Sequence, residues 1–323
     1  MRSLLRAATV GLMALVAAGQ TSARAEDAYP SHVVKLVVPA AGGSTTDAIA
    51  RLLADKLGRT WNQSVIVENI AGGAMNVGAE HVAKAAPDGY TLMVCPPAPV
   101  SIQHLLYHDL AYDPRRFVAV ALLAKIPNAL VVRNDLPAKD IKELIAYAKA
   151  NPGKLSFGSQ GAGSTAHLSA SQLEVLAGIK MVHVPYRGAL PALNDVIAGH
   201  IDMFFDTLTT SVPQWRAGKL RILAVASAER TKSVPELPTI AESGVPGFRS
   251  ITWFALVAPP ATPAAVVDKI NRDVNAAFAE LTEKFTAIRL EPMPGSAADA
   301  ARFIADESAL WGKVVKEAHI KLN

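Results

Sequence analysis

The chain has 323 residues, of which 50% are hydrophobic and 19% are charged, and its formal net charge at neutral pH is +4. This composition is typical of a folded protein rather than a disordered one, and the length is sufficient for two domains. The charged residues form no basic stripe with interleaved aromatic residues, which excludes the usual signature of a nucleic-acid-binding protein.

Residues 1–25 have the pattern of a signal peptide. Two arginines precede an apolar stretch at 7–18, and residues 23–25 (Ala-Arg-Ala) provide a cleavage site between small residues. The apolar stretch is too short to span a membrane, and no cysteine stands at the junction to carry a lipid anchor. We therefore expect a periplasmic protein whose mature chain begins near Glu26, the alternative being an ordinary buried first helix. Cleavage would remove three arginines and lower the net charge to +1.

The sequence gives little indication of a metal site formed by cysteine and histidine. The single cysteine, Cys95, lies in an apolar run before two prolines, which predicts a buried thiol without a disulfide. No cluster of Cys and His has metal-ligand spacing, so we expect no metal and no cofactor.

Residues 35–47 (KLVVPAAGGSTTD) combine a strand, a glycine turn and the start of a helix. The run at 35–38 is typical of a covered parallel strand, and Pro39 ends it because proline cannot donate to the next rung of a sheet. The four residues at 44–47 are all of types that cap helix N-termini, and an apolar helical pattern follows over 48–57. Free N–H groups and the positive end of a helix dipole make such a turn an anion-binding site.

The same pattern is repeated along the chain. After a strand at 65–68 comes a second glycine turn at 69–76, a helix at 77–85 and a third strand at 90–94. Alternating strands and helices predict parallel βαβ units, in which ligands lie beyond the carboxyl ends of the strands. Both glycine turns follow strands, so we expect them at the same edge of the sheet.

A second α/β block follows two strands that are expected to cross between domains. Its third glycine turn, at 159–165, follows a strand at 155–158 and precedes a helix at 166–177. The further predicted elements are crossing strands at 117–123, 130–133 and 251–258; helices at 141–150, 193–198, 239–244, 263–279 and 297–318; and strands at 181–185, 201–205 and 220–226. Two domains with glycine turns at their strand ends would enclose a ligand in the cleft between them.

Two enzyme-like patterns compete with that interpretation. Gly161, Gly163 and Ala166 fit G-x-G-x-x-A, but the acidic residue that a dinucleotide site needs at the end of the next strand is missing. Ser164, His167 and Asp206 are the residue types of a hydrolase triad, but no G-x-S-x-G motif surrounds the serine. His167 is expected on a helix surface or cap. Asp206 ends an apolar strand, where it would either cap a loop or accept a hydrogen bond from a ligand.

A set of short motifs gives the chain a family resemblance. In order, they are Tyr29-Pro-Ser31, VVPAAGGSTTD (37–47), Val67-Glu-Asn69, Gly72-Gly73, Asn76-Val-Gly78, APDGYT (86–91), GSQGAGSTAH (158–167), HVPYRG (183–188), Pro191-Ala192 and Ala198-Gly199. The set resembles the substrate-binding proteins of the tripartite tricarboxylate transporter family, the Bug receptors (Bordetella uptake gene). The resemblance spans essentially the whole mature chain.

The resemblance implies a two-domain α/β periplasmic binding fold of the type II-like, Venus-flytrap kind. Each domain would be a mainly parallel sheet flanked by helices, with two crossing strands as the hinge. Domain 1 is expected at 26–126 plus 252–323 and domain 2 at 127–251. The resemblance implies a monomeric receptor, not an enzyme, that captures a small di- or tricarboxylate, aromatic or amino-acid carboxylate and delivers it to a membrane permease.

The resemblance also implies which residues hold the ligand. Two loops of domain 1 would grip one carboxylate, and a loop and strand ends of domain 2 would hold the other end of the ligand. The expected ligand-binding residues are Gly43, Ser44, Thr45, Thr46, Asp47, Gly72, Gly73, Ala74, Asn76, Ser159, Gly161, Gly163, Ser164, Thr165, His167, Tyr186, Arg187 and Asp206.

The chain departs from the family pattern beside the expected carboxylate pocket. Ala40 stands where many members carry an aromatic residue, and Ile70-Ala71 stands where many carry Arg-Pro. These changes remove bulk and a charge, so a larger or less polar ligand is possible. Two alternative functions stay open from the sequence: a ligand-sensing subunit of a membrane kinase, and a secreted serine hydrolase.

Overall fold

The computed structural model describes residues 29–318 and 320. The described residues from Val33 onward belong to one compact unit, which contains all of the helices and strands described below. The expected signal peptide at 1–25 lies outside the described residues.

The first α/β group is built around the central strand β1. Its elements are β1 (Val34–Val38), α2 (Thr45–Trp61), β2 (Val65–Asn69), α3 (Asn76–Ala83) and β3 (Thr91–Cys95). β1 pairs in parallel with both β2 and β3, with Val38 of β1 opposite Asn69 of β2. The loops that follow β1 and β2 therefore leave the sheet at the same edge, as the sequence predicts.

The second α/β group repeats this arrangement around β5. Its elements are β5 (Ser156–Ser159), α6 (Thr165–Ala177), β6 (Val182–Pro185), α7 (Ala189–Ala198), β7 (Met203–Thr207), α8 (Leu208–Arg216) and β8 (Arg221–Val225). β5 pairs in parallel with β6 and β7. Helix α5 (Ile141–Ala150) precedes this group.

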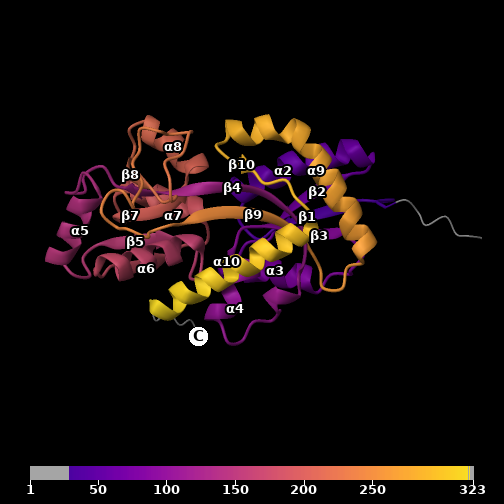
Figure 1. Ribbon diagram of the computed structural model, residues 1–323, viewed down its shortest axis with the longest axis horizontal. Coiled ribbons are helices and arrows are strands. Elements are labelled where there is room, and N and C mark those ends of the chain that lie inside the picture. The colour runs from indigo at the N-terminus through magenta and orange to yellow at the C-terminus, as the bar shows by residue number, and fades with distance from the viewer. Residues whose placement is uncertain (1–28, 319, 321–323) are drawn as a thin grey trace, which may run out of the picture. The chain divides into compact units, whose positions relative to one another are not determined.

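Two long strands, β4 (Val118–Val132) and β9 (Ile251–Ala258), run side by side between the two groups (Figure 1). β9 pairs with β3, whereas the end of β4 pairs with β7 and β8, and all of these pairings are antiparallel. The order β2-β1-β3-β9-β4-β7-β5-β6 is therefore a mixed sheet, parallel within each group and antiparallel at the crossing strands.

The sequence predicts two strands, at 117–123 and 130–133, where the structure has the single strand β4. Pro127 interrupts the apolar pattern, but it stands where β4 changes neighbours, from β9 to β7 and β8. Proline is tolerated there because no hydrogen-bond ladder between strands runs continuously past this position, so a backbone N–H is not required.

One further predicted helix is absent from the described structure, and one observed helix was not predicted. Residues 239–244 form turns rather than a helix, with Thr239 bridging Val225. Helix α8 is not predicted from the sequence because it contains three Ser or Thr residues and the internal Pro213. It forms because its Leu208 and Val212 are buried.

The C-terminal helices cover the sheet. They are α9 (Ala264–Ala287), eight residues longer than predicted at its end, and α10 (Ala297–Glu317), and between them the short strand β10 (Glu291–Pro292) pairs with β4. α10 contacts β4 and α6 as well as two short helices, η2 (Ala98–Ile102) and α4 (Gln103–Leu106). It thus contacts the second α/β group through α6, and it contacts the segment that follows the first group through η2 and α4.

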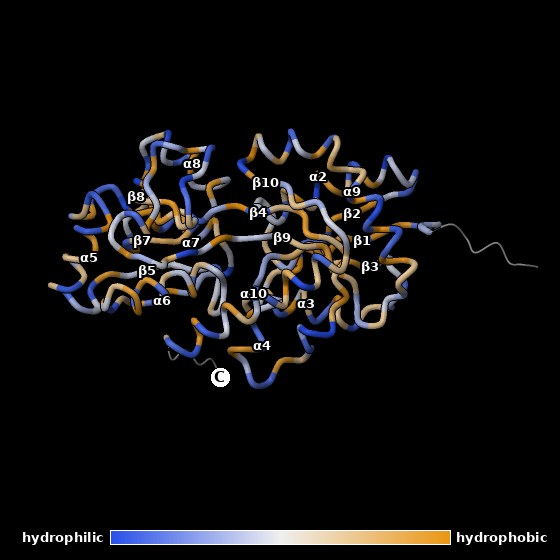
Figure 2. The backbone as a smooth tube through the Cα atoms, in the orientation of Figure 1, coloured by the Kyte–Doolittle hydropathy of each residue, from blue (hydrophilic) through white to orange (hydrophobic). Residues whose placement is uncertain are grey.

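The core follows the strands, along which Figure 2 shows hydrophobic segments, while hydrophilic ones lie on outer turns of the helices. Trp253 of β9 is fully buried, and its Nε1 donates to Glu307 Oε2 of α10 at 2.9 Å. Cys95 is a buried free thiol whose pKa is raised by desolvation, as expected from its apolar run. In the part of the chain that the structure describes, no helix has both the length and the apolarity needed to cross a membrane.

Candidate functional site

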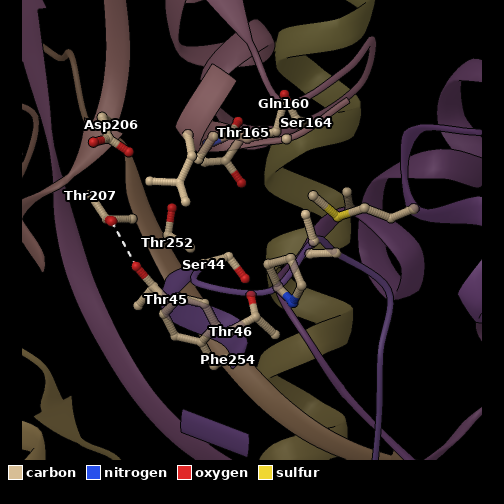
Figure 3. Close-up of a pocket in the computed structure, with 18 of the residues that line it drawn as sticks. Ser44, Thr45, Thr46, Gln160, Ser164, Thr165, Asp206, Thr207, Thr252 and Phe254 are labelled. Carbon is tan, nitrogen blue, oxygen red and sulfur yellow. Dashed lines mark hydrogen bonds between the residues drawn. The ribbon is translucent and has the colours of Figure 1, made fainter. Parts of the chain in front are cut away.

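A pocket lies where the carboxyl ends of the strands of both α/β groups meet. In Figure 3, Asp206 and Thr207 lie on one side, Gln160, Ser164 and Thr165 on another, and Ser44, Thr45 and Thr46 below them. We call this the inner pocket. Its lining is Ala40, Ala41, Gly42, Ser44, Thr45, Thr46, Met75, Pro96, Ala98, Gln160, Ser164, Thr165, Gly188, Ala189, Leu190, Pro191, Asp206, Thr207, Thr252 and Phe254.

An outer pocket adjoins the inner one and shares four of its lining residues. It is lined by Pro39, Ala40, Ala71, Gly72, Gly73, Ala74, Met75, Gln160, Tyr186, Arg187 and Gly188. Arg187 is exposed and is the only cation among the described residues of this lining. The second glycine turn therefore faces the outer pocket, whereas the first and third border the inner one.

The first loop is held by a capping arrangement at the start of α2. Ser44 is the N-cap, and its hydroxyl accepts a hydrogen bond from the Asp47 N–H at 3.2 Å. Asp47 Oδ2 accepts from the Gly43 N–H at 2.9 Å and from Arg51 Nε at 3.0 Å. Burial raises the pKa of the Asp47 carboxyl, but these hydrogen bonds outweigh it and leave the pKa below its usual value. Asp47 thus fixes the loop from behind, and it does not line the pocket.

The second loop has an unusual backbone. Four successive residues, 72–75, have positive φ, and two of them, Ala74 and Met75, are not glycine. A left-handed conformation costs an ordinary residue about 1–2 kcal/mol. Gln103 Nε2 of α4 donates to the Ala74 carbonyl at 2.8 Å and holds this conformation in place. Such strain is typical of loops that contact ligands.

The third loop leads into α6 and is closed on itself. Ser159 Oγ donates to the Gly161 carbonyl at 3.0 Å, and Ser164 is the N-cap of α6. A Cβ on Gly161 would lie 3.1 Å from the Cβ of Ala74, so the second and third loops approach closely. A Cβ on Gly163 would lie 2.6 Å from Leu106 of α4. Glycine is required at this position by both its φ of +78° and its surroundings.

Four helices begin at the inner pocket, and their first residues or N-caps line it. They are α2, α6, α7 and α8, which contribute Ser44, Ser164, Gly188 and Thr207 as N-caps. The first N–H groups of a helix lack partners within it, and the helix dipole is positive at this end. Among the described residues, the lining of the inner pocket contains no Lys or Arg. Its positive potential therefore comes from backbone dipoles rather than from cations.

Asp206 is the one ionisable side chain that the described residues contribute to this lining. It is 1% exposed and lies next to the end of β7. Its Oδ2 accepts a hydrogen bond from Thr210 Oγ1 of α8 at 2.6 Å, and its Oδ1 has no partner among the described residues. Burial raises the pKa of the carboxyl to about 7, against the opposing effect of the Thr210 hydroxyl and of the nearby Thr207 backbone N–H.

Hydroxyl groups connect the pocket walls. Thr45 Oγ1 of α2 and Thr207 Oγ1 lie 2.9 Å apart and join the two α/β groups. In β9, Thr252 Oγ1 donates to Asn128 Oδ1 of β4 at 2.8 Å, and Asn128 Nδ2 donates to Ser250 Oγ at 2.9 Å. Thr252, which lines the inner pocket, is thus part of a hydrogen-bond network that links the two crossing strands β4 and β9.

The triad considered from the sequence does not form. Ser164 Oγ accepts from the His167 N–H, and His167 Nδ1 accepts from the Gly163 N–H at 3.0 Å. The expectation of a surface histidine is wrong, because His167 is 7% exposed and its ring stacks on His183 with centroids 4.1 Å apart. The alternative expectation, a cap residue, agrees with these hydrogen bonds at the start of α6. Burial lowers the pKa of His167 to about 3 and that of His183 to about 4, so both rings are neutral near pH 7.

Most of the residues expected to bind the ligand line one of the two pockets. Those in the inner pocket are Ser44, Thr45, Thr46, Ser164, Thr165 and Asp206, and those in the outer pocket are Gly72, Gly73, Ala74, Tyr186 and Arg187. The others are not among the described lining residues of either pocket: Gly43, Asp47, Asn76, Ser159, Gly161, Gly163 and His167. Asn76, for example, accepts a hydrogen bond from the Tyr112 hydroxyl at 2.9 Å.

Several lining residues were not expected from the sequence. Gln160 borders both pockets, and Leu190 lies at the start of α7 with 37% of its surface exposed. Thr207, Thr252 and Phe254 are contributed by strands β7 and β9. Gln160 and Thr207 each stand next to an expected residue, which is the only local signal for them.

The departures from the family pattern have different structural positions. Ala40 borders both pockets and Ala71 borders the outer one, so both leave space beside the glycine turns. Ile70 instead packs against the core cluster that contains Val37 and Val82. Across the described residues, no group of three or more His, Cys, Asp or Glu side chains is arranged to hold a metal ion.

Comparison with known proteins places the chain among periplasmic binding proteins. Residues 49–320 match the model of the tripartite tricarboxylate transporter family receptor. Protein BugT of Bordetella pertussis is 33% identical over 98% of this chain and 98% of its own length.

Solved structures agree with this family match. R. palustris Rpa4515 with adipate has 38% identity and a TM-score of 0.87, covering 91% of this chain and 99% of that one. MatC from Rhodopseudomonas palustris with bound malate has 33% identity and a TM-score of 0.84, covering 89% of this chain and 100% of that one. The chain has the α/β fold of the periplasmic binding proteins and belongs to the tripartite tricarboxylate transporter receptor family, as its motifs predict.

Proposed function

We propose that this chain is a periplasmic receptor that captures a small carboxylate in the inner pocket and delivers it to a membrane permease of the tripartite tricarboxylate transporter type. The observation that carries this proposal is the convergence of four helix N-termini on a pocket whose lining, in the described part of the chain, contains no Lys or Arg. Unpaired N–H groups at the positive ends of helices are well suited to a carboxylate.

This arrangement favours reversible binding over chemistry. A lysine or arginine buried in the inner lining would lose much of its hydration whenever the pocket is empty, at a considerable cost in free energy. Backbone donors avoid that cost, and they act more strongly where the pocket walls exclude water. The relatives with adipate and malate support a carboxylate as the class of ligand.

The ligand would have one carboxylate at the N-termini of α2 and α6. The inner pocket has Thr46 of the first loop and Thr165 of the third loop in its lining, each in the first turn of its helix. Arg187 of the outer pocket is available for a second, more exposed anionic group. A plain surface cation of this kind contributes little by itself.

The proposal is tested by placing a negative charge in the pocket lining. Leu190→Asp adds a carboxylate at the second residue of α7, where an acidic residue is compatible with the helix. Repulsion of an anion should weaken carboxylate binding by roughly 10- to 100-fold. The matched control is Leu176→Asp, because Leu176 is 46% exposed near the end of α6 and lines neither pocket.

The measurement is calorimetric titration with mono-, di- and tricarboxylates after the protein has been unfolded and refolded to remove any ligand retained from expression. A thermal-shift screen would first identify the carboxylate, since binding to the native state alone raises the melting temperature. If Leu190→Asp and the control bind equally well, the carboxylate does not lie in the inner pocket. If no carboxylate shifts the wild-type protein, the carboxylate assignment is wrong.

A ligand-sensing subunit of a membrane kinase would use the same pocket in the same way. The two roles are separated by adding this protein to a strain that carries a permease of the tripartite tricarboxylate transporter type but lacks a receptor. Only a transport receptor restores uptake of the carboxylate. The hydrolase alternative has no support in the geometry, since Ser164 and His167 are joined by a helix-capping contact rather than by a side-chain hydrogen bond.

A further inference from the structure

The innermost charged group of the pocket is unusual for an anion site. Asp206 is a carboxylate, and it lies in the lining that four helix N-termini otherwise make positive. Its side chain is 1% exposed, and the structure pairs only one of its two oxygens with a hydroxyl. The other oxygen, Oδ1, is buried and has no partner in the described chain. A buried acceptor of this kind is costly unless something donates to it.

The neighbouring side chains do not meet this demand. Thr210 donates to Oδ2 at 2.6 Å, and the hydroxyl of Thr207 lies 2.9 Å from that of Thr45 and 3.1 Å from that of Thr210. In β4, the residue opposite Asp206 is Ala129, which offers no side-chain donor. The charged groups of the surrounding loops, Asp47 and Arg187, lie behind the first loop and in the outer pocket. Within the part of the chain that the structure describes, no lysine, arginine or histidine shares the inner lining with Asp206.

The pocket is therefore bipolar. The helix N-termini offer donors to a carboxylate, whereas Asp206 offers an acceptor at the end of β7. A plain saturated dicarboxylate has only acceptors when ionised, so it can satisfy the first group but not Asp206. A carboxylate that carries an ammonium or hydroxyl group on its chain can satisfy both.

We propose that Asp206 is the specificity-determining residue of this pocket and selects carboxylates that bear a hydrogen-bond donor, an ammonium or a hydroxyl group, over the unsubstituted acids of the same chain length. This inference rests on the proposed function and adds the substrate class. Discrimination by a buried polar group is strong because the wrong ligand leaves that group unpaired. An ammonium ligand gains most, since it forms a charge-assisted hydrogen bond with the carboxylate.

The test uses three matched series of probes, each with one carbon skeleton. They are succinate, malate and aspartate; glutarate, 2-hydroxyglutarate and glutamate; and adipate, 2-hydroxyadipate and 2-aminoadipate. Affinities are measured by calorimetry at pH 7.5 with the refolded, ligand-free protein. In the series whose length fits the pocket, the member with a donor should bind roughly 10- to 100-fold more tightly than the unsubstituted acid. The hydroxyl and ammonium members identify which donor is preferred.

Asp206→Asn removes the charge while nearly preserving the shape of the side chain. It should weaken binding of the donor-bearing acid by roughly 10-fold or more, whereas the affinity for the unsubstituted acid should stay the same or rise, because a negative charge is removed from an anion-binding pocket. Asp268→Asn makes the same chemical change on the exposed surface of α9 and should change neither affinity. Circular dichroism and melting curves establish that each variant is folded.

The outcomes separate the two proposals. If the unsubstituted acids bind as tightly as the substituted ones in the wild-type protein, the role of Asp206 is refuted while the carboxylate receptor stands, and this result needs no variant. If a preference exists but survives Asp206→Asn, the preference has another source and the inference is also refuted. If no acid of any series binds, both proposals fail.

Discussion

Asp206 also makes a prediction about stability that does not depend on any ligand. Its ordinary pKa is 3.8 and burial raises the pKa to about 7 in the folded protein. Each pKa unit corresponds to about 1.4 kcal/mol, so ionising the buried carboxyl should cost on the order of 4 kcal/mol of folding free energy. Asp206→Asn replaces it with a neutral amide and removes this cost.

The sign follows from proton binding. Between pH 3.8 and about 7 the folded state retains the Asp206 proton, whereas the unfolded state has released it. Stability falls with rising pH wherever the folded state binds more protons. The wild-type protein should therefore lose stability relative to Asp206→Asn as the pH rises from about 4 to 7, and the difference should level off above the folded pKa.

Buried histidines have the opposite effect in part of this range. The pKa values of His167 and His183 are lowered to about 3 and about 4 from 6.5, so their contribution to stability increases as the pH rises towards 6.5. Because both proteins contain these histidines, their effect cancels in the difference between the two. Asp268→Asn serves as the control for a change in surface charge, since Asp268 is exposed on α9.

The assay is reversible urea unfolding of the ligand-free proteins at half-unit steps from pH 4 to 8. The quantity of interest is the difference in unfolding free energy between wild type and Asp206→Asn at each pH. A difference that does not change with pH, or in which the wild type gains stability as the pH rises, would refute the reasoning. It would mean that water or a shifted backbone solvates the carboxylate in the folded state.

Four other substitutions test the framework of the fold and the first loop of the pocket. Gly78→Ala should cost about 2 kcal/mol of stability, because its Cβ would lie 2.7 Å from a backbone oxygen of the second loop. Gly153→Ala, whose Cβ meets nothing within 4 Å but whose φ is +72°, should cost about 1 kcal/mol, and equal losses in urea unfolding would contradict the packing argument. Glu307→Leu should cost about 2 kcal/mol by leaving the Trp253 indole N–H without its acceptor, and an unchanged urea midpoint would show that this contact is dispensable. Asp47→Ala should weaken carboxylate binding about 10-fold in calorimetry by releasing the first-loop amide that it holds, so unchanged affinity would exclude that role.

The three glycine turns illustrate what local sequence determines. Ser44 and Ser164 cap α2 and α6 by accepting hydrogen bonds from N–H groups three residues later, so each cap is contained within a few residues. The short apolar runs before the turns specify buried strands, and parallel pairing then brings the first two turns to one edge of the sheet. The family resemblance draws on these same motifs, which is why both the fold and the family were predictable.

The position of Asp206 was also predictable, but its environment was not. An acidic residue at the end of an apolar strand is expected near the edge of a sheet, whether it caps a loop or faces a ligand. Only the folded chain shows that it is buried and that one of its oxygens has no partner. The burial of Asp206 and its unpaired oxygen depend on how other helices and strands pack around it.

Contacts between distant parts of the chain determined the rest. Thr45 and Thr207 are 162 residues apart in sequence, and their contact at 2.9 Å exists only because the ends of β1 and β7 meet across the pocket. His167 is one turn into a helix and is compatible with an exposed position, yet packing against His183 buries it. Periodicity and capping act over three or four residues, so they specify the strands, turns and helix starts. The composition of the pocket wall depends on which of those ends the tertiary structure brings together.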